Sequence, residues 1–370
     1  MKVVRTKVKK SKYSIGVDFG TESGRVVIVD IHSGETQGTH IVSYRHNVIT
    51  EYLPMHSEKL PKGSALQHPQ DYLDVLEEGI PSAIKKAQIT PDQIIGLGID
   101  FTSSTILPTD YNLTPLCFYQ ELAHSPHAWA KLWKHHNTKS QTEKIYRLAL
   151  RRNEKWLRRL GYNVSEEWAL PKIVEVFEKN REIYNNAAYF IEASDWIVSI
   201  LTSTITRSNC SLGFKAFWDE EEGYPQDFFM ELDEEFGSTV LEKLQGQVRN
   251  VGTRAGSLTK WWAEKLDLPI GLPIATGIID AHSALLGCGV HLPNTLMMVM
   301  GTSTCHLMLN PDFKEIPGIS GVVKDGIIPG LYAYEAGQSA VGDIFGAYVN
   351  GHIPTSYYRE AERSGISIFE

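Results

Sequence analysis

The N-terminal part of the chain alternates between short apolar runs and polar turns. Apolar runs cover residues 14–18, 26–30 and 39–45, and the polar stretch His32-Ser33-Gly34-Glu35 separates the last two. Runs of this length between turn residues are typical of β-strands. The pattern therefore predicts three consecutive antiparallel strands.

A helical pattern follows these strands. Its apolar face is formed by Leu73, Leu76, Ile80, Ala83 and Ala87. Pro81 lies inside the pattern, and because proline lacks an N–H group we expect a kink or break near Gly79. The apolar run 94–100 then predicts a fully buried strand, parallel to the first. Three antiparallel strands, a helix and a parallel strand are the order of a ribonuclease-H-like half-domain.

Residues 125–260 differ from this first part because they are largely helical and rich in tryptophan. The indole side chains are those of Trp129, Trp133, Trp156, Trp168, Trp196 and Trp218. We expect an insert that forms a wall over the sheet. Most of its aromatic rings should pack in a core, since aromatic side chains are usually buried.

A second unit is expected to begin near residue 269. The segment 269–277 has the pattern of an opening strand, and an apolar helix is predicted behind Asp280. A hairpin over 295–309, a strand over 331–337 and a helix over 339–349 complete the predicted elements. After Val349 the chain lacks the buried strands needed to finish a half-domain, which predicts a fragment of a longer protein.

The chain length supports this division. Since 370 residues exceed what one core usually organises, two domains are expected. The predicted fold class is α/β with two related half-domains, the second incomplete. The first would comprise 1–268, with the Trp-rich insert and most of the candidate ligand site, and the second, incomplete, would comprise 269–370.

Charge and cysteine spacing disfavour several classes of protein. A net charge of -8 argues against a nucleic-acid partner, because phosphate-backbone binding normally needs a basic surface. No apolar run reaches the roughly 18 residues of a membrane span, and the basic N-terminal run lacks the apolar core of a signal peptide. The four cysteines form no C-x-x-C pair, which disfavours a zinc site or a disulfide framework. A cytoplasmic protein without a membrane partner is expected.

The first hairpin carries phosphate-binding chemistry. Asp18 ends a strand, Gly20 and Gly24 allow close approach of backbone N–H groups, and the hydroxyls of Thr21 and Ser23 follow. Arg25 adds a fixed positive charge. An ordinary β-turn is an equally good interpretation of this stretch alone. A second hairpin with Gly301-Thr302-Ser303-Thr304 at its turn favours two half-domains facing one nucleotide.

Two acids at strand ends suit a magnesium ion. Asp18 and Asp100 both end apolar strands, and such ends line one crevice of a sheet. A hydrated Mg²⁺ prefers one or two carboxylates together with phosphate oxygens. Each acid alone would more often be a turn or cap residue. Asp18 is the stronger candidate because the phosphate-binding residues follow it.

Charged residues of the second half suit a polyol substrate. Asp280 heads an apolar helix, where an N-cap role and a catalytic base facing a cleft are equally good interpretations. Lys215 and Glu335 lie among aromatic or small residues, and a buried charge needs a partner or a polyol hydroxyl. His282 could orient a substrate, although a single histidine near a helix start is usually structural.

Several longer motifs resemble one family. They are the segments 18–25, 98–105, 132–136, 192–196, 300–303 and 335–343. With these motifs the chain resembles the FGGY carbohydrate kinases of the actin-like ATPase superfamily, and within them the ribulokinase group. The resemblance spans nearly the whole chain.

The resemblance implies ATP-dependent phosphorylation of the terminal 5-hydroxyl of L-ribulose to L-ribulose 5-phosphate in L-arabinose catabolism. Asp280 would be the general base and Asp18 the acid on the Mg²⁺ side. The implied phosphate cradle consists of Thr21, Ser23, Arg25, Gly301, Thr302 and Ser303. The implied sugar pocket consists of Ser103, Trp133, Lys215, Asp280 and Glu335, of which Ser103 is the least secure. Family members carry more C-terminal sequence with the adenosine pocket, so this chain is expected to hold the sugar side of the site and to lack full activity.

Two other functions remain open. A kinase of the same family could act on D-ribulose, ribitol or xylulose. Discrimination between such polyols depends on the exact positions of the groups that contact their hydroxyls, which the sequence does not give. A non-catalytic actin-like nucleotide switch would need no polyol pocket. Oligomeric state cannot be derived from the sequence, although base rates favour a homodimer.

Overall fold

The first sheet brings together strands from distant parts of the chain. The computed structural model describes residues 11–301 and 303–369. The sheet's strands are β1 (Tyr13–Phe19), β2 (Ser23–Asp30), β3 (Thr36–Ser43), β5 (Ile94–Phe101), β11 (Arg254–Ser257), β12 (Pro273–Ala275) and β13 (Ile278–Ile279). Their order is β11-β12-β5-β1-β2-β3, with β13 also paired to β5. The predicted antiparallel meander β1–β3 and the parallel strand β5 are confirmed.

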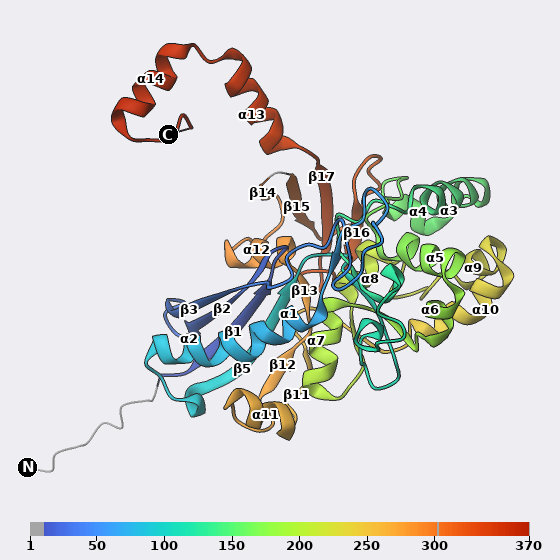
Figure 1. Ribbon diagram of the computed structural model, residues 1–370, viewed down its shortest axis with the longest axis horizontal. Helices are drawn as coiled ribbons and strands as arrows, with labels where there is room; N and C mark the ends of the chain where they lie inside the picture. The colour runs from blue at the N-terminus through green and yellow to red at the C-terminus, as the bar shows by residue number, and fades with distance from the viewer. Residues whose placement is uncertain (1–10, 302, 370) are drawn as a thin grey trace, which may run out of the picture.

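The helix that follows β3 is interrupted where the sequence predicts. It consists of α1 (Pro69–Asp74), a π-helical turn over Val75–Gly79 and α2 (Ile80–Ala87). Proline removes one backbone donor, so the wider π turn before Pro81 accommodates the interrupted hydrogen-bond ladder. Helix α2 packs on β2 and β3, as Figure 1 shows.

The two faces of the first sheet differ in burial. Ile15, Val17 and Phe19 alternate with Gly16 and Asp18 along β1, and only the first three are buried. Strand β5 follows the same alternation, and Ile95 is 39% exposed. The expectation of a fully buried β5 is therefore wrong, because helices cover one face of the strand and glycines and Asp100 occupy the other.

The insert between β5 and β11 is largely helical, as predicted. Its helices are α3 (Lys139–Arg152), α4 (Lys155–Arg159), α5 (Ala169–Lys179), α6 (Arg181–Asn186), α7 (Ala193–Thr202), α8 (Asn209–Lys215), α9 (Gln226–Leu232) and α10 (Glu234–Lys243), followed by α11 (Lys260–Leu266). Short strands β4 (Leu66–Gln67), β6 (Ile106–Thr109), β7 (Ala130–Lys131) and β8 (Tyr189–Glu192) form a small sheet, and β9 (Thr206–Ser208) pairs with β10 (Gln247–Arg249). Trp129, Trp156, Trp168 and Trp196 are buried in cores. Trp133 and Trp218 are half-buried.

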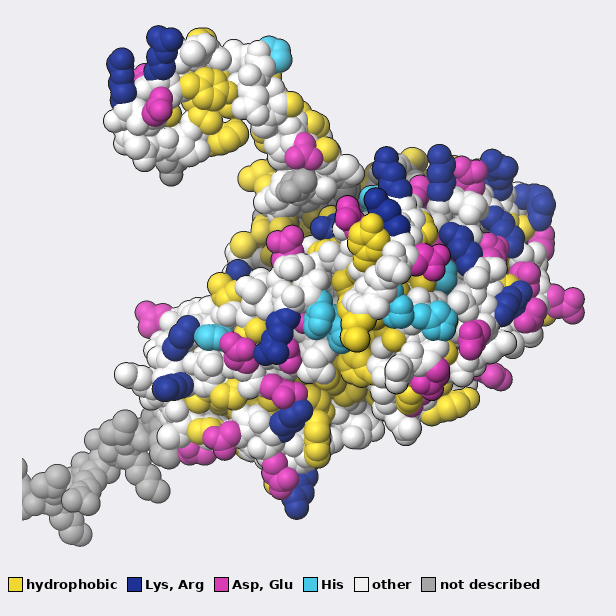
Figure 2. All heavy atoms as spheres, in the orientation of Figure 1, with side chains coloured by type: hydrophobic (Ala, Val, Ile, Leu, Met, Phe, Trp, Pro, Cys, Tyr) yellow, Lys and Arg dark blue, Asp and Glu magenta, His cyan; other side chains and the backbone are white. Residues whose placement is uncertain are grey.

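A second sheet follows helix α12 (Asp280–Gly287). It contains β14 (Leu296–Met300), β15 (Thr304–Asn310), β16 (Gly321–Lys324) and β17 (Tyr332–Gln338), all antiparallel, in the order β14-β15-β17-β16. Helices α13 (Val341–His352) and α14 (Thr355–Ser364) then project away from the body (Figure 1). Apolar side chains of β14 and α13, including Met298, Met300 and Phe345, are exposed on this part of the molecule (Figure 2).

The segment 269–277 does not open the second sheet. Strand β12 pairs with β5, and β13 continues along the same strand, so both belong to the first sheet. Local patterning could not reveal this because a parallel pairing joins strands far apart in sequence. The division of the chain at 268/269 stays a prediction. Within the described residues, no helix is long and apolar enough to cross a lipid bilayer.

Close packing of α2 on β3 gives a test of this fold. A Cβ on Gly38 would lie 2.5 Å from the carbonyl oxygen of Ala83 and 2.8 Å from the backbone nitrogen of Ala87. Backbone atoms cannot move aside cheaply, so we expect Gly38→Ala to lower the free energy of unfolding by about 1–3 kcal/mol. Urea denaturation would measure it. The control is Gly98→Ala in β5, where a Cβ meets no atom within 4 Å; equal losses in both variants would contradict the packing.

Candidate active site

Three acidic side chains meet at one edge of the first sheet. Asp18 and Asp100 are direct partners on the parallel strands β1 and β5. Ile278 pairs with Asp100 on the other side of β5, and Asp280 begins α12 directly after β13. The carboxyl ends of neighbouring parallel strands open on one crevice, which is where α/β sheets bind ligands. The sheet therefore gathers acids that are far apart along the chain.

Asp100 holds a proton at neutral pH. Burial, the charge of Asp18, a hydrogen bond to Asp18 and the charge of Asp280 together raise the pKa of its carboxyl group to about 8. A hydrogen bond from Ser283 acts in the opposite direction. Two adjacent carboxylates repel each other when both are ionised, so one proton remains on the pair.

Asp280 is ionised under the same conditions. Burial, and to a smaller extent the charges of Asp18 and Glu335, raise the pKa of its carboxyl group to about 6. The backbone N–H of Ala281 donates to its Oδ1 at 2.7 Å and lowers the pKa, as does the charge of Lys215. The N-cap of α12 is Ile279, so Asp280 is the first helical residue rather than the cap.

The first hairpin is held by a tight turn and by side chains behind it. The N–H of Gly20 donates to the carbonyl of Ser23 at 3.0 Å, and Arg25 Nη1 lies 3.4 Å from Asp18 Oδ2. The Trp133 indole N–H donates to Thr21 Oγ1 at 3.1 Å. A residue of the expected sugar pocket thus contacts a residue of the expected phosphate cradle.

Two residues that the sequence analysis missed support this hairpin. Gln67 Nε2 donates to the Thr21 carbonyl at 2.7 Å, and the Tyr72 hydroxyl donates to Gln67 Oε1 at 2.7 Å. Both supporting residues are buried. The sequence held no signal for them, because each lies in an otherwise ordinary helical or strand pattern.

The second hairpin is exposed. The N–H of Gly301 donates to the carbonyl of Ser303, two residues on, at 2.9 Å, whereas Gly20 of the first hairpin donates to a carbonyl three residues on. Thr302 lies outside the described residues. Within the described part of the chain, no hydrogen bond or ion pair joins Gly301 or Ser303 to the first hairpin. Burial, with the charges of Glu335 and Asp280, raises the pKa of the nearby Cys305 thiol to about 12 against the effect of Lys215.

Lys215 and Glu335 form a buried ion pair between α8 and β17. Lys215 Nζ donates to Glu335 Oε1 at 2.6 Å, and His282 Nε2 lies 2.9 Å from Glu335 Oε2. On the other side of the ring, Cys210 Sγ lies 3.0 Å from His282 Nδ1. The sequence analysis expected a partner for each of the two charges, and the structure shows that they partner each other.

The protonation states of this group follow from its contacts. Burial lowers the pKa of His282, which keeps the imidazole neutral, although Glu335 acts against this. Burial alone would raise the pKa of Glu335, but Lys215 and His282 together lower it to about 2. An ionised Glu335 accepts from His282 Nε2–H, so Nδ1 accepts from the Cys210 thiol, whose pKa burial raises.

Ser103 is the least defined of the expected site residues. It is half-buried in the loop after β5, and the next residue, Ser104, has a left-handed backbone with φ 53°. Within the described residues, its hydroxyl makes no side-chain hydrogen bond. Its place beside Asp100, at the same end of β5, is what brings it to the site.

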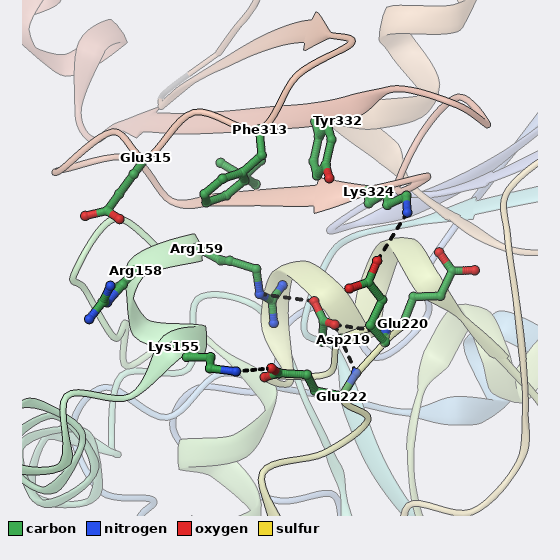
Figure 3. A pocket seen from close by; sticks show the side chains of 12 residues that line it. Lys155, Arg158, Arg159, Asp219, Glu220, Glu222, Phe313, Glu315, Lys324 and Tyr332 are labelled. Carbon is green, nitrogen blue, oxygen red and sulfur yellow. Dashed lines mark hydrogen bonds and ion pairs between the residues drawn. The ribbon is translucent and has the colours of Figure 1, made fainter.

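A cavity elsewhere has a different character. It occupies about 340 Å³ between α4, the loop 219–222 and the second sheet (Figure 3). Its charges pair with one another, including Arg159 with Asp219 at 3.3 Å and Lys324 with Glu221 at 3.4 Å. None of the expected site residues lines it. The acids at the strand ends therefore remain the candidate site.

Comparison with known proteins gives this geometry a context. Residues 13–287 match the N-terminal domain of the FGGY family of carbohydrate kinases, and residues 296–365 match its C-terminal domain. Ribulokinases of Staphylococcus aureus strains Newman and Mu50 are 48% and 47% identical over 358 residues, which is 97% of this chain. The chain spans 65% of the length of these relatives.

Solved structures share the fold at low sequence identity. Xylulose kinase from Rhodospirillum rubrum matches 95% of this chain and 66% of its own with a TM-score of 0.72 at 16% identity. Plasmodium falciparum glycerol kinase with ADP matches 95% of this chain and 67% of its own with a TM-score of 0.71 at 14% identity. The expected α/β, actin-like ATPase architecture is confirmed.

The raised pKa of Asp100 predicts how stability depends on pH. A carboxyl group whose pKa is higher in the folded state contributes stability at low pH, and this contribution is lost as the pH rises through about 8. Asp100→Asn keeps a donor and cannot ionise. In EDTA, we expect the variant to melt near wild type at pH 4 and about 3 °C or more above it at pH 9.

Thermal melting across this pH range would measure the difference. The matched control is Asp227→Asn at an exposed position of α9, which should show no such trend. A difference between Asp100→Asn and wild type that is independent of pH would contradict the shared proton.

Proposed function

The chain belongs to the FGGY family of carbohydrate kinases, and from this we propose that it acts in ATP-dependent phosphorylation of the 5-hydroxyl of L-ribulose, giving L-ribulose 5-phosphate in L-arabinose catabolism. Support comes from the ribulokinases that are 48% identical over 97% of this chain. Because the chain spans 65% of their length, the activity of the whole protein is part of the proposal. We place this activity in the cytoplasm.

One observation carries the proposal. Asp280 is ionised and begins α12 directly after β13, which pairs with β5 at Asp100. The charges of Asp18, Glu335 and Lys215 act on the pKa of Asp280, and its own charge acts on that of Asp100. Phosphoryl transfer to an alcohol needs a base for the hydroxyl proton, placed between the acceptor and the phosphates. A carboxylate with a pKa of about 6 is well suited to this, since it is free to accept a proton at neutral pH.

The phosphate side of the site would consist of the two hairpins. Thr21, Ser23 and Arg25 of the first hairpin, with Gly301, Thr302 and Ser303 of the second, are proposed to contact the phosphates of ATP. Arg25 is half exposed, so its guanidinium is able to bind an anion in addition to its contact with Asp18. Hydroxyls, backbone N–H groups and a guanidinium are the donors that phosphate oxygens require.

Asp18 and Asp100 fit a magnesium ion. Among residues 11–301 and 303–369, no three acidic, histidine or cysteine side chains form a metal cluster. Mg²⁺ bound to a nucleotide needs only one or two protein carboxylates, which the Asp18–Asp100 pair supplies. When bound there, Mg²⁺ would neutralise phosphate charge.

The sugar side would be formed by Ser103, Trp133, Lys215 and Glu335, with Asp280 at its border. Each Glu335 oxygen already accepts one internal hydrogen bond. A carboxylate oxygen has room for a second donor, so Glu335 is able to accept from a sugar hydroxyl as well. The internal partners thereby fix the direction of the carboxylate before a ligand arrives.

Two alternatives differ in the acceptor. A related kinase would prefer D-ribulose, ribitol or xylulose, and a nucleotide switch would ignore every sugar. The buried charges favour a polyol, since a switch has no need of Lys215 and Glu335 at the crevice. A homodimer stays a prediction.

A panel of polyols tests the proposal. L-ribulose, D-ribulose, xylulose and ribitol would be titrated into the whole protein by calorimetry, and ADP release would be measured with each. We expect L-ribulose to bind most tightly and to stimulate ADP release most. Preference for another polyol would replace the substrate, and the absence of any sugar binding would favour the switch.

Replacement of Asp280 tests its role as base. Asp280→Asn keeps the shape of the side chain but cannot accept the hydroxyl proton, so we expect kcat to fall at least about 10²–10⁴-fold. Binding of L-ribulose should change little. Coupled ADP release and calorimetry on the whole protein would measure the two effects, and turnover near the wild-type level would remove Asp280 from this role.

A further inference from the structure

Lys172 is a fully buried lysine in the first turn of helix α5. Its side chain is 0% exposed. Its Nζ donates to the carbonyl oxygen of Ser104 at 2.6 Å and to that of Leu132 at 2.9 Å. Within the described residues, both of its hydrogen bonds go to backbone carbonyls, and no carboxylate lies at ion-pair distance. This is unusual, because buried ammonium groups are normally paired.

The two carbonyls belong to the loops that carry the expected sugar-pocket residues. Ser104 directly follows Ser103 in the loop after β5. Leu132 directly precedes Trp133 in the loop after β7. These loops lie far apart in sequence. One ammonium group thus joins their backbones at the positions next to Ser103 and Trp133.

Stability alone does not explain a lysine at this position. Removing an ammonium group from water costs several kcal/mol, and an apolar side chain of similar length often stabilises a buried site at least as well. Burial lowers the pKa of Lys172 to about 7, and the charges of Glu192 and Glu167 only partly offset this. Glu192 Oε1 itself has no hydrogen-bond partner among the described residues. The group therefore contributes something other than a strong ion pair.

The strained backbone of one loop indicates what Lys172 contributes. Ser104 has φ 53°, a conformation that non-glycine residues adopt only when their surroundings impose it. The short contact from Lys172 to the Ser104 carbonyl is one such constraint. On the other loop, the Leu132 carbonyl also accepts from the backbone N–H of His135, which closes a turn around Trp133.

We propose that Lys172 is a positioning residue for the sugar pocket, which fixes the loops of Ser103 and Trp133 at their separation for a pentulose. It acts without touching the substrate. Because the Trp133 indole donates to Thr21, the same clamp sets the sugar loop against the phosphate hairpin. The proposal rests on the proposed function in one respect, namely that these loops bind a sugar.

The test compares two lysine-to-methionine variants. Lys172→Met removes the clamp and keeps the length of the side chain. Lys243→Met is the matched control, because Lys243 Nζ donates to the Ala187 carbonyl at 2.6 Å in the same insert, away from both loops. Binding of L-ribulose would be measured by calorimetry, and amide hydrogen exchange would be measured over residues 102–105 and 132–138.

For Lys172→Met we expect at least about tenfold weaker binding of L-ribulose and faster exchange in both loops. Lys243→Met should leave binding and loop exchange unchanged. If Lys172→Met does not fold, as judged by circular dichroism, Lys172→Gln replaces it, since the amide is too short to reach both carbonyls. Wild-type affinity together with wild-type exchange in the folded Lys172 variant would overturn the proposal.

The two proposals fail in different ways. If the wild-type chain binds no pentulose, the proposed function fails, and the exchange measurement alone decides whether Lys172 holds the loops. If the wild type binds L-ribulose and both lysine variants lose affinity equally, the effect is a general one of the insert. That outcome would also overturn the positioning role.

Discussion

The pairing of β5 with β1 on one side and β13 on the other is the constraint on which the site depends. Parallel pairing places Asp18 opposite Asp100 and delivers Asp280 to the same edge. A shift of one residue in either register would turn the acids to the face covered by helices. The apolar residues that alternate with them, such as Val17 and Ile99, are buried and therefore fix the register. The same strands thus contribute apolar residues to the core on one face and the acids of the site on the other.

Buried charge is the second organising feature. Lys215, Glu335 and His282 leave water together, and Lys172 does so with carbonyl groups as its partners. Such groups seldom stabilise a fold more than apolar residues would, but their hydrogen bonds are directional, whereas apolar contacts are not. In this chain they belong to α5, α8, α12 and β17. In the proposed sugar pocket they would hold polar groups from both halves of the chain in fixed orientations.

Local features of this structure were predictable from sequence, and long-range pairings were not. The first hairpin, the interruption before Pro81 and the helical insert follow from turn residues, proline chemistry and periodicity, and the structure confirms them. The pairing of β12 and β13 with β5 was missed, because the sequence of a short strand does not identify the distant strand with which it pairs. Lys215 and Glu335 were recognised as charges that need partners, yet nothing in the sequence indicated that they meet each other. Cys210 and Gln67 had no signal at all, since their roles arise only from contacts across the fold.

The proton that the Asp18–Asp100 pair retains has a consequence for any cation that arrives there. A divalent ion that bound both carboxyl groups would need both as anions, so its binding would expel the proton into solvent. Affinity for the ion then increases as the medium becomes more alkaline, and the heat of association depends on which buffer takes up the released proton. Acidification of the surroundings would thereby weaken binding of such an ion while the fold stays intact.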